Sequence, residues 1–417
     1  MSKESGIFAE LKVIDCASFI AGPAAATILS DFGADVIKVE PPGTGDPYRF
    51  LYRLEPNPSS SKNYFWQLTN RNKRSIALNL KSPASVEILQ KLILGADVFV
   101  INFPPHVRRV LRLTYQDVSK LNPKIIYADI SGYGEKGPEA DKPGYDVTAY
   151  WARTGLMNSA RDLNSPPAFP VAGIGDHATA STLYGAIVTG LYRREKTGTG
   201  CHVSTSLIGE GAWAVGGWLQ AALDGAIPAK QIDRTSPLNA LVNTYQTEDI
   251  RWLMLAFVQE DKDWPGLIKA MNRLDLLTDN RFVDTKRRRE NVKVLTKILE
   301  ETFLTKPIDY WREALDKENV TFGVVQTIEE LATDAQLIQN DIILPIQNGT
   351  DKNSFTVDSP MKIKEEVKVQ PKPAPGLGQH TIEILSELGY DATEIDALQT
   401  SGAIPNPSYP RVKPHQV

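Results

Sequence analysis

Cysteine is scarce in this chain: only Cys16 and Cys201 occur in 417 residues. Two cysteines cannot build a disulfide framework, and their separation does not match the spacing of a metal site. Both lie in strand-like runs, so we expect buried thiols rather than reactive ones. No metal centre is expected from the sequence.

Long apolar runs are also missing. No hydrophobic stretch reaches the length needed to span a membrane. The segment from Met1 to Glu10 lacks the charged and then apolar pattern of a secretory signal. With so few cysteines, these features lead us to expect a cytoplasmic protein that is not attached to a membrane.

The chain has no excess of positive charge. Its formal net charge is −4, from 46 Lys and Arg residues and 50 Asp and Glu residues. Nucleic acid is therefore not expected as a partner, because polyanion binding depends on a basic surface. An anionic ligand would have to be held by a local group of basic residues.

The first strand and helix lack the glycine fingerprint of dinucleotide-binding proteins. The pattern predicts a strand over Leu11 to Asp15, a helix from Ala21 to Phe32 ended by Gly33, and a strand over Asp35 to Glu40. This unit predicts a parallel sheet covered by helices. Because no G-x-G-x-x-G links its strand and helix, a nicotinamide- or flavin-dependent dehydrogenase is disfavoured.

Strands and helices continue to alternate up to about residue 131. The pattern predicts a helix from Pro83 to Leu94 and another over Val107 to Leu121. The composition changes after about Leu223, where a hairpin over Thr244 to Phe257 precedes helices rich in Lys, Arg and Glu. We expect a second, smaller domain here, with the basic run Lys286 to Arg289 at the solvated start of a helix.

A single carboxylate lies among glycines and small residues in the stretch Val171 to Ala180. Gly173 and Gly175 allow sharp turns and close approach of another molecule. Asp176 has two interpretations: it is the N-cap of the helix that follows, or an exposed nucleophile at the mouth of a pocket. The local sequence does not decide between them.

Short motifs spread over nearly the whole chain resemble the class III coenzyme A transferases, a family typified by formyl-CoA transferase and the carnitine CoA-transferases. Each motif is weak alone, and their order and spacing carry the resemblance. The motifs are Ala21-Gly22-Pro23, Gly33 to Pro41, Asn72 to Ile76, Asn102-Phe103, Gly144-Tyr145-Asp146, Gly175-Asp176, Thr197 to Gly200 and Pro373 to Thr381.

The resemblance implies that Asp176 is the catalytic nucleophile of a reversible CoA transfer. In that family the matching carboxylate attacks an acyl-CoA, and CoA then passes through a mixed anhydride and an aspartyl-CoA thioester to a free carboxylic acid. A carboxylate suits this role because anhydride and thioester stages are close in energy. Backbone N–H groups of the glycines would reach the developing oxyanion. No permanently bound cofactor is implied, since CoA and acyl-CoA are substrates.

The same resemblance implies a set of CoA-binding residues, of which Asn102 and Phe103 follow a predicted buried strand. They are Phe19, Ile20, Ala21, Leu78, Lys81, Asn102, Phe103, Arg109 and Tyr145. The chain departs from the family pattern where phosphates would be held. An expected arginine falls on Val110, next to Arg109, and an expected lysine falls on Pro143.

Two alternatives remain open. An α-methylacyl-CoA racemase shares the fold and the CoA site but needs two acid/base groups around the α-carbon. The histidine of such enzymes falls on Tyr145, and a tyrosine hydroxyl is a poor base at neutral pH. Neither His106 nor His177 occupies that position. A non-catalytic acyl-CoA-binding protein is the other alternative, and the Gly175-Asp176 pair argues against it.

The resemblance further implies an interlocked homodimer of two ring-shaped chains. A Rossmann-like α/β domain over residues 1–224 would be completed by a returning C-terminal segment, residues 334–417. Residues 225–333 would form a smaller α+β domain. The identity of the acids does not follow, although Trp151, Met157, Trp213 and Trp218 are candidates for an apolar acyl pocket or for plain core.

Overall fold

The chain folds into two compact units in a computed structural model that describes residues 6–228, 231, 233–347 and 354–405. The first unit contains the described residues of Met1–Leu156, Pro170–Asp224 and Gln336–Val417. The second contains those of Met157–Phe169 and Gly225–Ala335. The first five and the last twelve residues of the segments predicted for the large domain lie outside the described residues.

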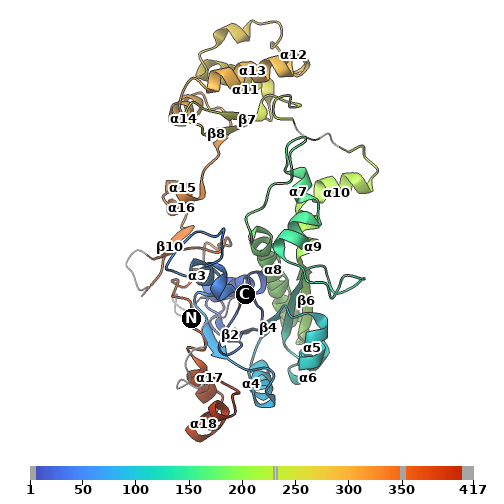
Figure 1. Cartoon of the computed structure of the whole chain (residues 1–417), viewed down its shortest axis with the longest axis vertical. Helices are drawn as coiled ribbons and strands as arrows, with labels where there is room; N and C mark the ends of the chain where they lie inside the picture. Colours follow the sequence, from blue (N-terminus) through green and yellow to red (C-terminus); the bar gives the residue numbers. More distant parts are fainter. Residues whose placement is uncertain (1–5, 229–230, 232, 348–353, 406–417) are drawn as a thin grey trace. The chain divides into compact units, whose positions relative to one another are not determined.

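Six parallel strands form the centre of the first unit (Figure 1). Across the sheet they are β3 (Arg74–Ala77), β2 (Asp35–Glu40), β1 (Lys12–Asp15), β4 (Val98–Ile101), β5 (Ile126–Ser131) and β6 (Cys201–Ser206). The order reverses between β1 and β4, as in doubly wound Rossmann-type sheets. The predicted α/β fold with a Rossmann-like parallel sheet is confirmed.

Side chains of the strands alternate between two hydrophobic layers, one on each face of the sheet. In β4, Val98 and Val100 pack in one layer, whereas Phe99 and Ile101 pack in the other. The first layer contains helices α1 (Ala21–Asp31) and α8 (Ile174–Thr197). The second contains α4 (Pro83–Leu94), α17 (Thr381–Glu387) and α18 (Ala392–Thr400), so the C-terminal helices complete the core of this unit.

The helix predicted over Val107 to Leu121 is wrong as a single element. The structure has α5 (Pro105–Leu111) and α6 (Tyr115–Leu121) instead. Arg112 takes a left-handed conformation with φ of 53°, which ends α5. Thr114 then accepts a hydrogen bond from the N–H of Asp117 and starts α6. A non-glycine residue in this conformation gives no clear sequence signal for the break.

Shorter elements complete the first unit and its connections. They are α2 (Tyr48–Leu51), α3 (Tyr64–Asn70), the π-type turn η1 (Asp146–Ala152), α7 (Leu156–Ser159), α9 (Leu207–Ala214), α10 (Gly216–Leu223), α16 (Ala335–Gln339), β10 (Ile343–Pro345) and β11 (Phe355–Val357). None of the helices in the described residues has both the length and the apolar character needed to cross a membrane.

The second unit has a three-stranded antiparallel sheet and its own hydrophobic core. The strands are β7 (Val242–Gln246), β8 (Trp252–Ala256) and β9 (Phe322–Val324). The helices are α11 (Glu260–Ala270), η2 (Leu274–Leu277), α12 (Thr285–Glu290), α13 (Val292–Phe303), α14 (Ile308–Lys317) and α15 (Ile328–Leu331). The predicted hairpin is confirmed by β7 and β8, which pair in antiparallel register.

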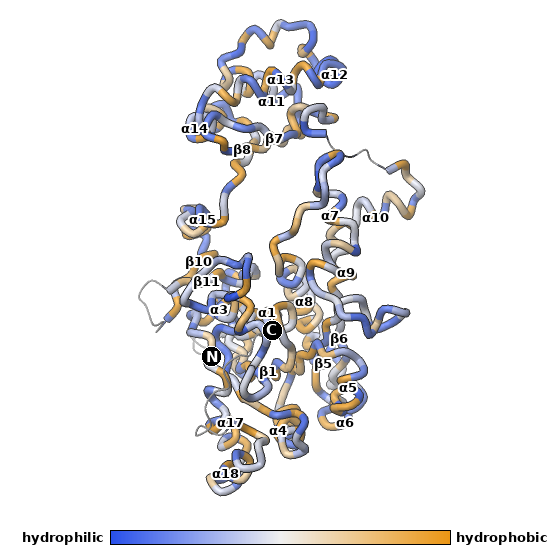
Figure 2. The backbone as a smooth tube through the Cα atoms, in the orientation of Figure 1, coloured by the Kyte–Doolittle hydropathy of each residue, from blue (hydrophilic) through white to orange (hydrophobic). Residues whose placement is uncertain are grey.

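The basic run in α12 is hydrophilic throughout (Figure 2), and three of its four residues are exposed, as expected. Arg288 differs, since it is only 2% exposed. Its guanidinium donates to the carbonyl of Phe282 at 2.8 Å and pairs with Asp261. The expectation of a fully solvated run is therefore wrong at Arg288, because its helix turns that side chain into the core.

Candidate active site

Most of the predicted CoA-binding residues follow the carboxyl ends of β1, β3 and β4, which lie at the same edge of the parallel sheet. The exceptions are Arg109, which lies in α5, and Tyr145, which directly precedes η1. The reversal of strand order between β1 and β4 makes this edge a general place for ligands. Asn102, directly after β4, connects the end of this strand to the turn that follows β1. Its Oδ1 accepts from the N–H of Ser18 at 2.9 Å, and its Nδ2 donates to the carbonyl of Ser18 at 2.8 Å.

The turn after β1 is held by buried charges. Phe19 has a φ of 65°, a conformation that is uncommon for residues other than glycine. Its N–H donates to Oδ1 of Asp46 at 3.1 Å. The other oxygen of Asp46 forms a 3.0 Å ion pair with Lys38, which also pairs with Asp15 at 3.7 Å. This network fixes the backbone of the predicted Phe19–Ile20–Ala21 segment.

The same turn contacts the segments around the predicted nucleophile. The ring of Phe19 meets that of Tyr145 edge-on, with centroids 6.0 Å apart. Cδ1 of Ile20 lies 3.1 Å from the position that a Cβ on Gly173 would take. The structure therefore brings Phe19, Ile20 and Tyr145 to the start of the helix that carries Asp176.

Four other predicted residues differ in their exposure. Leu78 is 1% exposed and packs in the hydrophobic layer of the sheet, so only its backbone is available to a ligand. Lys81 and Arg109 are exposed. Phe103 is partly buried, and its carbonyl accepts a 2.6 Å hydrogen bond from Nε of Arg108. A role of Lys81 or Arg109 in holding phosphates stays a prediction.

Arg108 belongs to a charged cluster that the sequence did not indicate. Its guanidinium donates to Glu135 at 2.6 Å and lies 3.4 Å from Asp129, which is buried and also pairs with His202. The carboxylates and the imidazole come close enough to suggest metal ligands, with their nearest atoms within 4.8 Å. Arg108 already supplies the compensating positive charge, so we interpret the cluster as a support for the loop at Phe103.

Asp176 is the third residue of α8, a helix of 24 residues. The N-cap is Gly173, whose φ of 94° is accessible to glycine and strained for other residues. The interpretation of Asp176 as the helix cap is therefore wrong. Its carboxylate is not used in capping and remains available for chemistry.

The capping role belongs to Asp146, in η1. Its Oδ2 accepts a hydrogen bond from the N–H of Gly173 at 2.6 Å, and its Oδ1 accepts one from the N–H of Gly175 at 2.9 Å. The expectation that these two N–H groups reach a developing oxyanion is therefore wrong, because both already donate to Asp146. A Cβ on Gly175 would overlap Oδ1 of Asp146 and the ring of Tyr150, so only glycine fits there. Asp146 belongs to the Gly144-Tyr145-Asp146 motif, and nothing in the local sequence indicated that it would cap another helix.

Burial raises the pKa of Asp176 to about 7, with a further contribution from the charge of Asp146. This direction is opposite to the usual effect of a helix N-terminus, which favours a charged carboxylate. The next residue, His177, has its pKa lowered by burial and by the charge of Arg71. The site therefore holds a carboxylate of unusual basicity beside a neutral imidazole.

Tyr48 is a further residue that the sequence did not indicate. It is 1% exposed, and its ring stacks on Phe65 with centroids 5.2 Å apart. Burial raises the pKa of Tyr48, and the charges of Asp176 and Asp46 raise it further. Its hydroxyl is thus within electrostatic reach of the candidate nucleophile.

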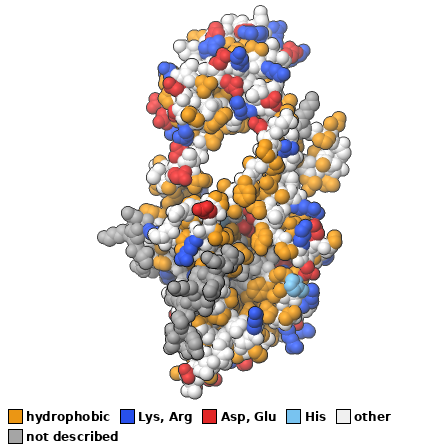
Figure 3. All heavy atoms as spheres, in the orientation of Figure 1, with side chains coloured by type: hydrophobic (Ala, Val, Ile, Leu, Met, Phe, Trp, Pro, Cys, Tyr) orange, Lys and Arg blue, Asp and Glu red, His pale blue; other side chains and the backbone are white. Residues whose placement is uncertain are grey.

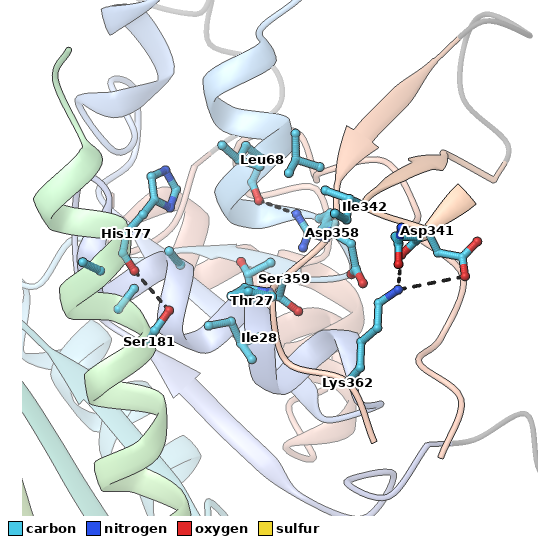
Figure 4. Close-up of a pocket in the computed structure, with 17 residues that line it drawn as sticks. Thr27, Ile28, Leu68, His177, Ser181, Asp341, Ile342, Asp358, Ser359 and Lys362 are labelled. Atoms are coloured by element: carbon cyan, nitrogen blue, oxygen red, sulfur yellow. Dashed lines mark hydrogen bonds and ion pairs between the residues drawn. The ribbon is translucent and has the colours of Figure 1, made fainter. Parts of the chain in front are cut away.

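A cavity of about 730 Å³ is lined in part by His177, the residue that follows Asp176 in α8. His177 and Ser181 of α8 lie on one side, and Figure 4 shows Ile342 and Asp358 across from them. Its wall is mainly apolar, and its volume falls in the range of small-molecule sites. None of the aromatic residues considered for an acyl pocket lines it, and Trp213 and Trp218 are instead 82% and 69% exposed.

The fold is the one that the motifs lead one to expect, and a family model agrees with it. The model described as CoA-transferase family III matches residues 8–381. The chain belongs to CoA-transferase family III. The family resemblance found in the sequence is confirmed, and with it the assignment as an enzyme.

Curated relatives of this family III enzyme cover nearly its whole length. It is 35% identical over 396 residues to (R)-2-hydroxy-4-methylpentanoate CoA-transferase of Clostridioides difficile, covering 94% of this chain and 98% of the relative. It is 32% identical over 403 residues to cinnamoyl-CoA:phenyllactate CoA-transferase of Clostridium sporogenes, covering 96% and 97%. A CaiB/BaiF family protein from Brucella suis has a similar structure, with a TM-score of 0.81 at 26% identity, covering 92% and 100%.

Proposed function

We propose that this enzyme transfers CoA reversibly from an acyl-CoA thioester to a free carboxylic acid, with Asp176 as the covalent nucleophile. The observation that carries the proposal is the state of this carboxylate. Asp176 lies in the first turn of α8, takes no part in capping it, and has a pKa raised to about 7. A carboxylate that is more basic than usual is a better nucleophile toward a thioester carbonyl.

The reaction then has two symmetrical halves. The Asp176 carboxylate attacks the thioester carbonyl and the carbon–sulfur bond breaks. CoA thiolate is released, and a mixed anhydride between Asp176 and the donor acid is formed. The thiolate attacks the aspartyl carbonyl, which releases the donor acid and forms an aspartyl-CoA thioester. The acceptor carboxylate expels the thiolate to form a second anhydride, and thiolate attack on the acceptor carbonyl yields the new acyl-CoA and free Asp176.

The remaining predicted residues, from Phe19 to Tyr145, form the proposed CoA site. Its support is that Phe19, Leu78 and Asn102 follow the carboxyl ends of β1, β3 and β4. Phe19, Ile20 and Tyr145 also lie beside the start of α8. CoA and its thioesters would be bound as substrates. The low cysteine content is the basis for placing the reaction in the cytoplasm.

The choice of acids is guided by the relatives. The names of two of them refer to 2-hydroxy acids with an apolar side chain, 2-hydroxy-4-methylpentanoate and phenyllactate. That of a third, from Mus musculus and 32% identical over 398 residues, contains the dicarboxylate glutarate. We therefore propose these three acids as the first candidates for donor and acceptor.

We also propose that the enzyme is a homodimer, interlocked as the family resemblance implies. Support comes from the exposed apolar side chains of α9 and α10, visible over α10 in Figure 3. Trp213, Trp218 and Leu223 are 82%, 69% and 73% exposed. Large apolar patches of this kind are typical of protein–protein interfaces.

The activity is tested by mixing the protein with an acyl-CoA and each free acid and identifying the new CoA thioester by mass spectrometry. We expect acyl exchange in the wild type and none in Asp176→Asn. Asp117→Asn is the control for the loss of a carboxylate from the third position of a helix, α6; unlike Asp176, Asp117 also accepts a hydrogen bond from Thr114. Solvent deuterium entering the α-carbon without exchange would support the racemase alternative and contradict the proposal.

A further inference from the structure

We propose that Asp146 is a positioning residue for Asp176, which holds the start of α8 in place and keeps the Asp176 carboxylate free to react. The inference rests on the proposed role of Asp176 as nucleophile. Asp146 itself touches no reacting atom in this scheme and acts through the helix terminus.

Both carboxylate oxygens of Asp146 are used at the end of α8. They accept hydrogen bonds of 2.6 and 2.9 Å from the N–H groups of Gly173 and Gly175. Asp146 is only 4% exposed, and Gly175 packs so closely against it that a Cβ would not fit. The backbone on the N-terminal side of Asp176 is therefore fixed by a side chain from another element, η1.

The same contacts change the electrostatics of the helix end. Free N–H groups and the macrodipole at a helix N-terminus favour a negative charge nearby. Here the negative charge of Asp146 already occupies that end, so the helix offers little further stabilisation to an ionised Asp176. Burial and the repulsion from Asp146 then raise the pKa of Asp176 to about 7. Asp146 thus lowers the fraction of Asp176 that is ionised at neutral pH and makes the ionised carboxylate more basic.

Other titratable groups also lie around this helix end. Tyr150 of η1 packs against Gly175, and Glu210 of α9 acts on Tyr150. The charge of Asp176 raises the pKa of Tyr48 in α2, and the charge of Arg71 lowers the pKa of His177 in α8.

The pKa of Asp176 itself has two contributions, burial and Asp146, and no cation of the described residues offsets them. Removing the charge of Asp146 is thus the direct way to change the proton affinity of Asp176.

Asp146→Asn removes the charge and leaves one oxygen to accept from two N–H groups. We expect the acidic limb of the kcat/KM profile to move to lower pH by about one unit. We also expect kcat at neutral pH to fall about tenfold or more, because the nucleophile is less basic and less well placed. KM for the acyl-CoA should stay close to that of the wild type. Asp391→Asn, which alters the cap of α18, is the matched control and should leave the profile unchanged.

A second readout does not depend on activity. Carbodiimide activates protonated carboxyl groups, so coupling of an amine to Asp176, followed by peptide mass spectrometry across pH, reports its protonation. We expect labelling of Asp176 in the wild type up to about pH 7 and in Asp146→Asn only to about one unit lower. Gly175→Ala, which pushes Asp146 away, should shift the labelling in the same direction.

The outcomes separate the two proposals. The same labelling profile in the wild type and in Asp146→Asn would overturn the role of Asp146, whatever the activity. Unchanged transferase activity in Asp176→Asn would overturn the proposed function, while the labelling experiment would still decide the influence of Asp146. A shifted profile together with a reduced kcat supports both.

Discussion

The carboxamide of Asn102 and the backbone of Ser18 exchange two hydrogen bonds, which tie the end of β4 to the turn after β1. The pair lies where the strand order reverses, at the proposed CoA site. Asn102 thereby controls the relative position of two segments that follow neighbouring strands, and its importance is positional as well as chemical.

Asn102→Ala should raise KM for the acyl-CoA and lower the free energy of unfolding by about 1–3 kcal/mol, because Ser18 loses both partners. The control is Asn122→Ala. Asn122 donates to the carbonyls of Ile93 and Ala96 at 3.0 and 2.7 Å, away from the carboxyl edge. A comparable loss of stability with an unchanged KM is expected there. Equal KM values in the two variants would contradict the positional role.

Arg108 and Arg109 are neighbours with opposite surroundings, which makes them a matched pair. Arg108→Met should lower the free energy of unfolding by about 3 kcal/mol or more, since it leaves buried Asp129 with less compensation. Arg109→Met should hardly change stability and should raise KM for CoA thioesters, if the exposed side chain attracts phosphate as predicted. Urea denaturation and steady-state kinetics measure both effects. An unchanged KM in Arg109→Met would refute that part of the CoA site.

The raised pKa of Asp176 predicts that its ionised carboxylate lowers the free energy of unfolding. In the unfolded chain its pKa returns to the ordinary 3.8, so the folded protein binds more protons between about pH 4 and pH 7. The contribution of Asp176 to stability therefore becomes less favourable as pH rises through this window. Asp176→Asn should be more stable than the wild type above pH 7, by up to about 4 kcal/mol, and equal to it below about pH 4.

Urea denaturation of the two proteins at several pH values measures this difference. Asp309→Asn, which removes an exposed carboxylate from the first turn of α14, serves as the control. A wild type at least as stable as Asp176→Asn throughout the range would show that the carboxylate carries no such cost.

The exposed side chains of Trp213 and Trp218 lead us to expect that they contribute to the proposed dimer interface. Replacing both Trp213 and Trp218 by serine should weaken or abolish the proposed homodimer, because apolar surface is lost from it. Sedimentation velocity of the wild type and the variant gives the oligomeric state. Leu94→Ser, in α4, removes a 55% exposed apolar side chain elsewhere and should leave the dimer intact. A wild-type monomer would contradict the proposal outright.

Much of the large unit was predictable because its signals are local. The bounds of β2 and α4 match the expectations closely, since alternating apolar runs, Pro83 and the following glycine each act within a few residues. The break at Arg112 depends on a left-handed residue that no local pattern required. The second C-terminal helix, α18, was missed as well, and it is stabilised by packing on the sheet.

The candidate nucleophile could be proposed from the sequence, whereas the contacts around it could not. Asp176 could be singled out by its glycines and by the ordered motifs around it. The contribution of Asp146 could not, because it arises where η1 meets α8, 30 residues further along the chain. Tyr48 and Arg108 were missed for the same reason: their roles come from burial and charge supplied by distant segments.

The central claim is that Asp176 forms covalent intermediates, and trapping tests it most directly. The protein is incubated with a productive acyl-CoA, quenched with hydroxylamine, which attacks anhydrides and thioesters, and analysed by peptide mass spectrometry. The account predicts a hydroxamate on Asp176 that needs the acyl-CoA and is absent in Asp176→Asn. A label on another residue, or full transferase activity in Asp176→Asn, would contradict it.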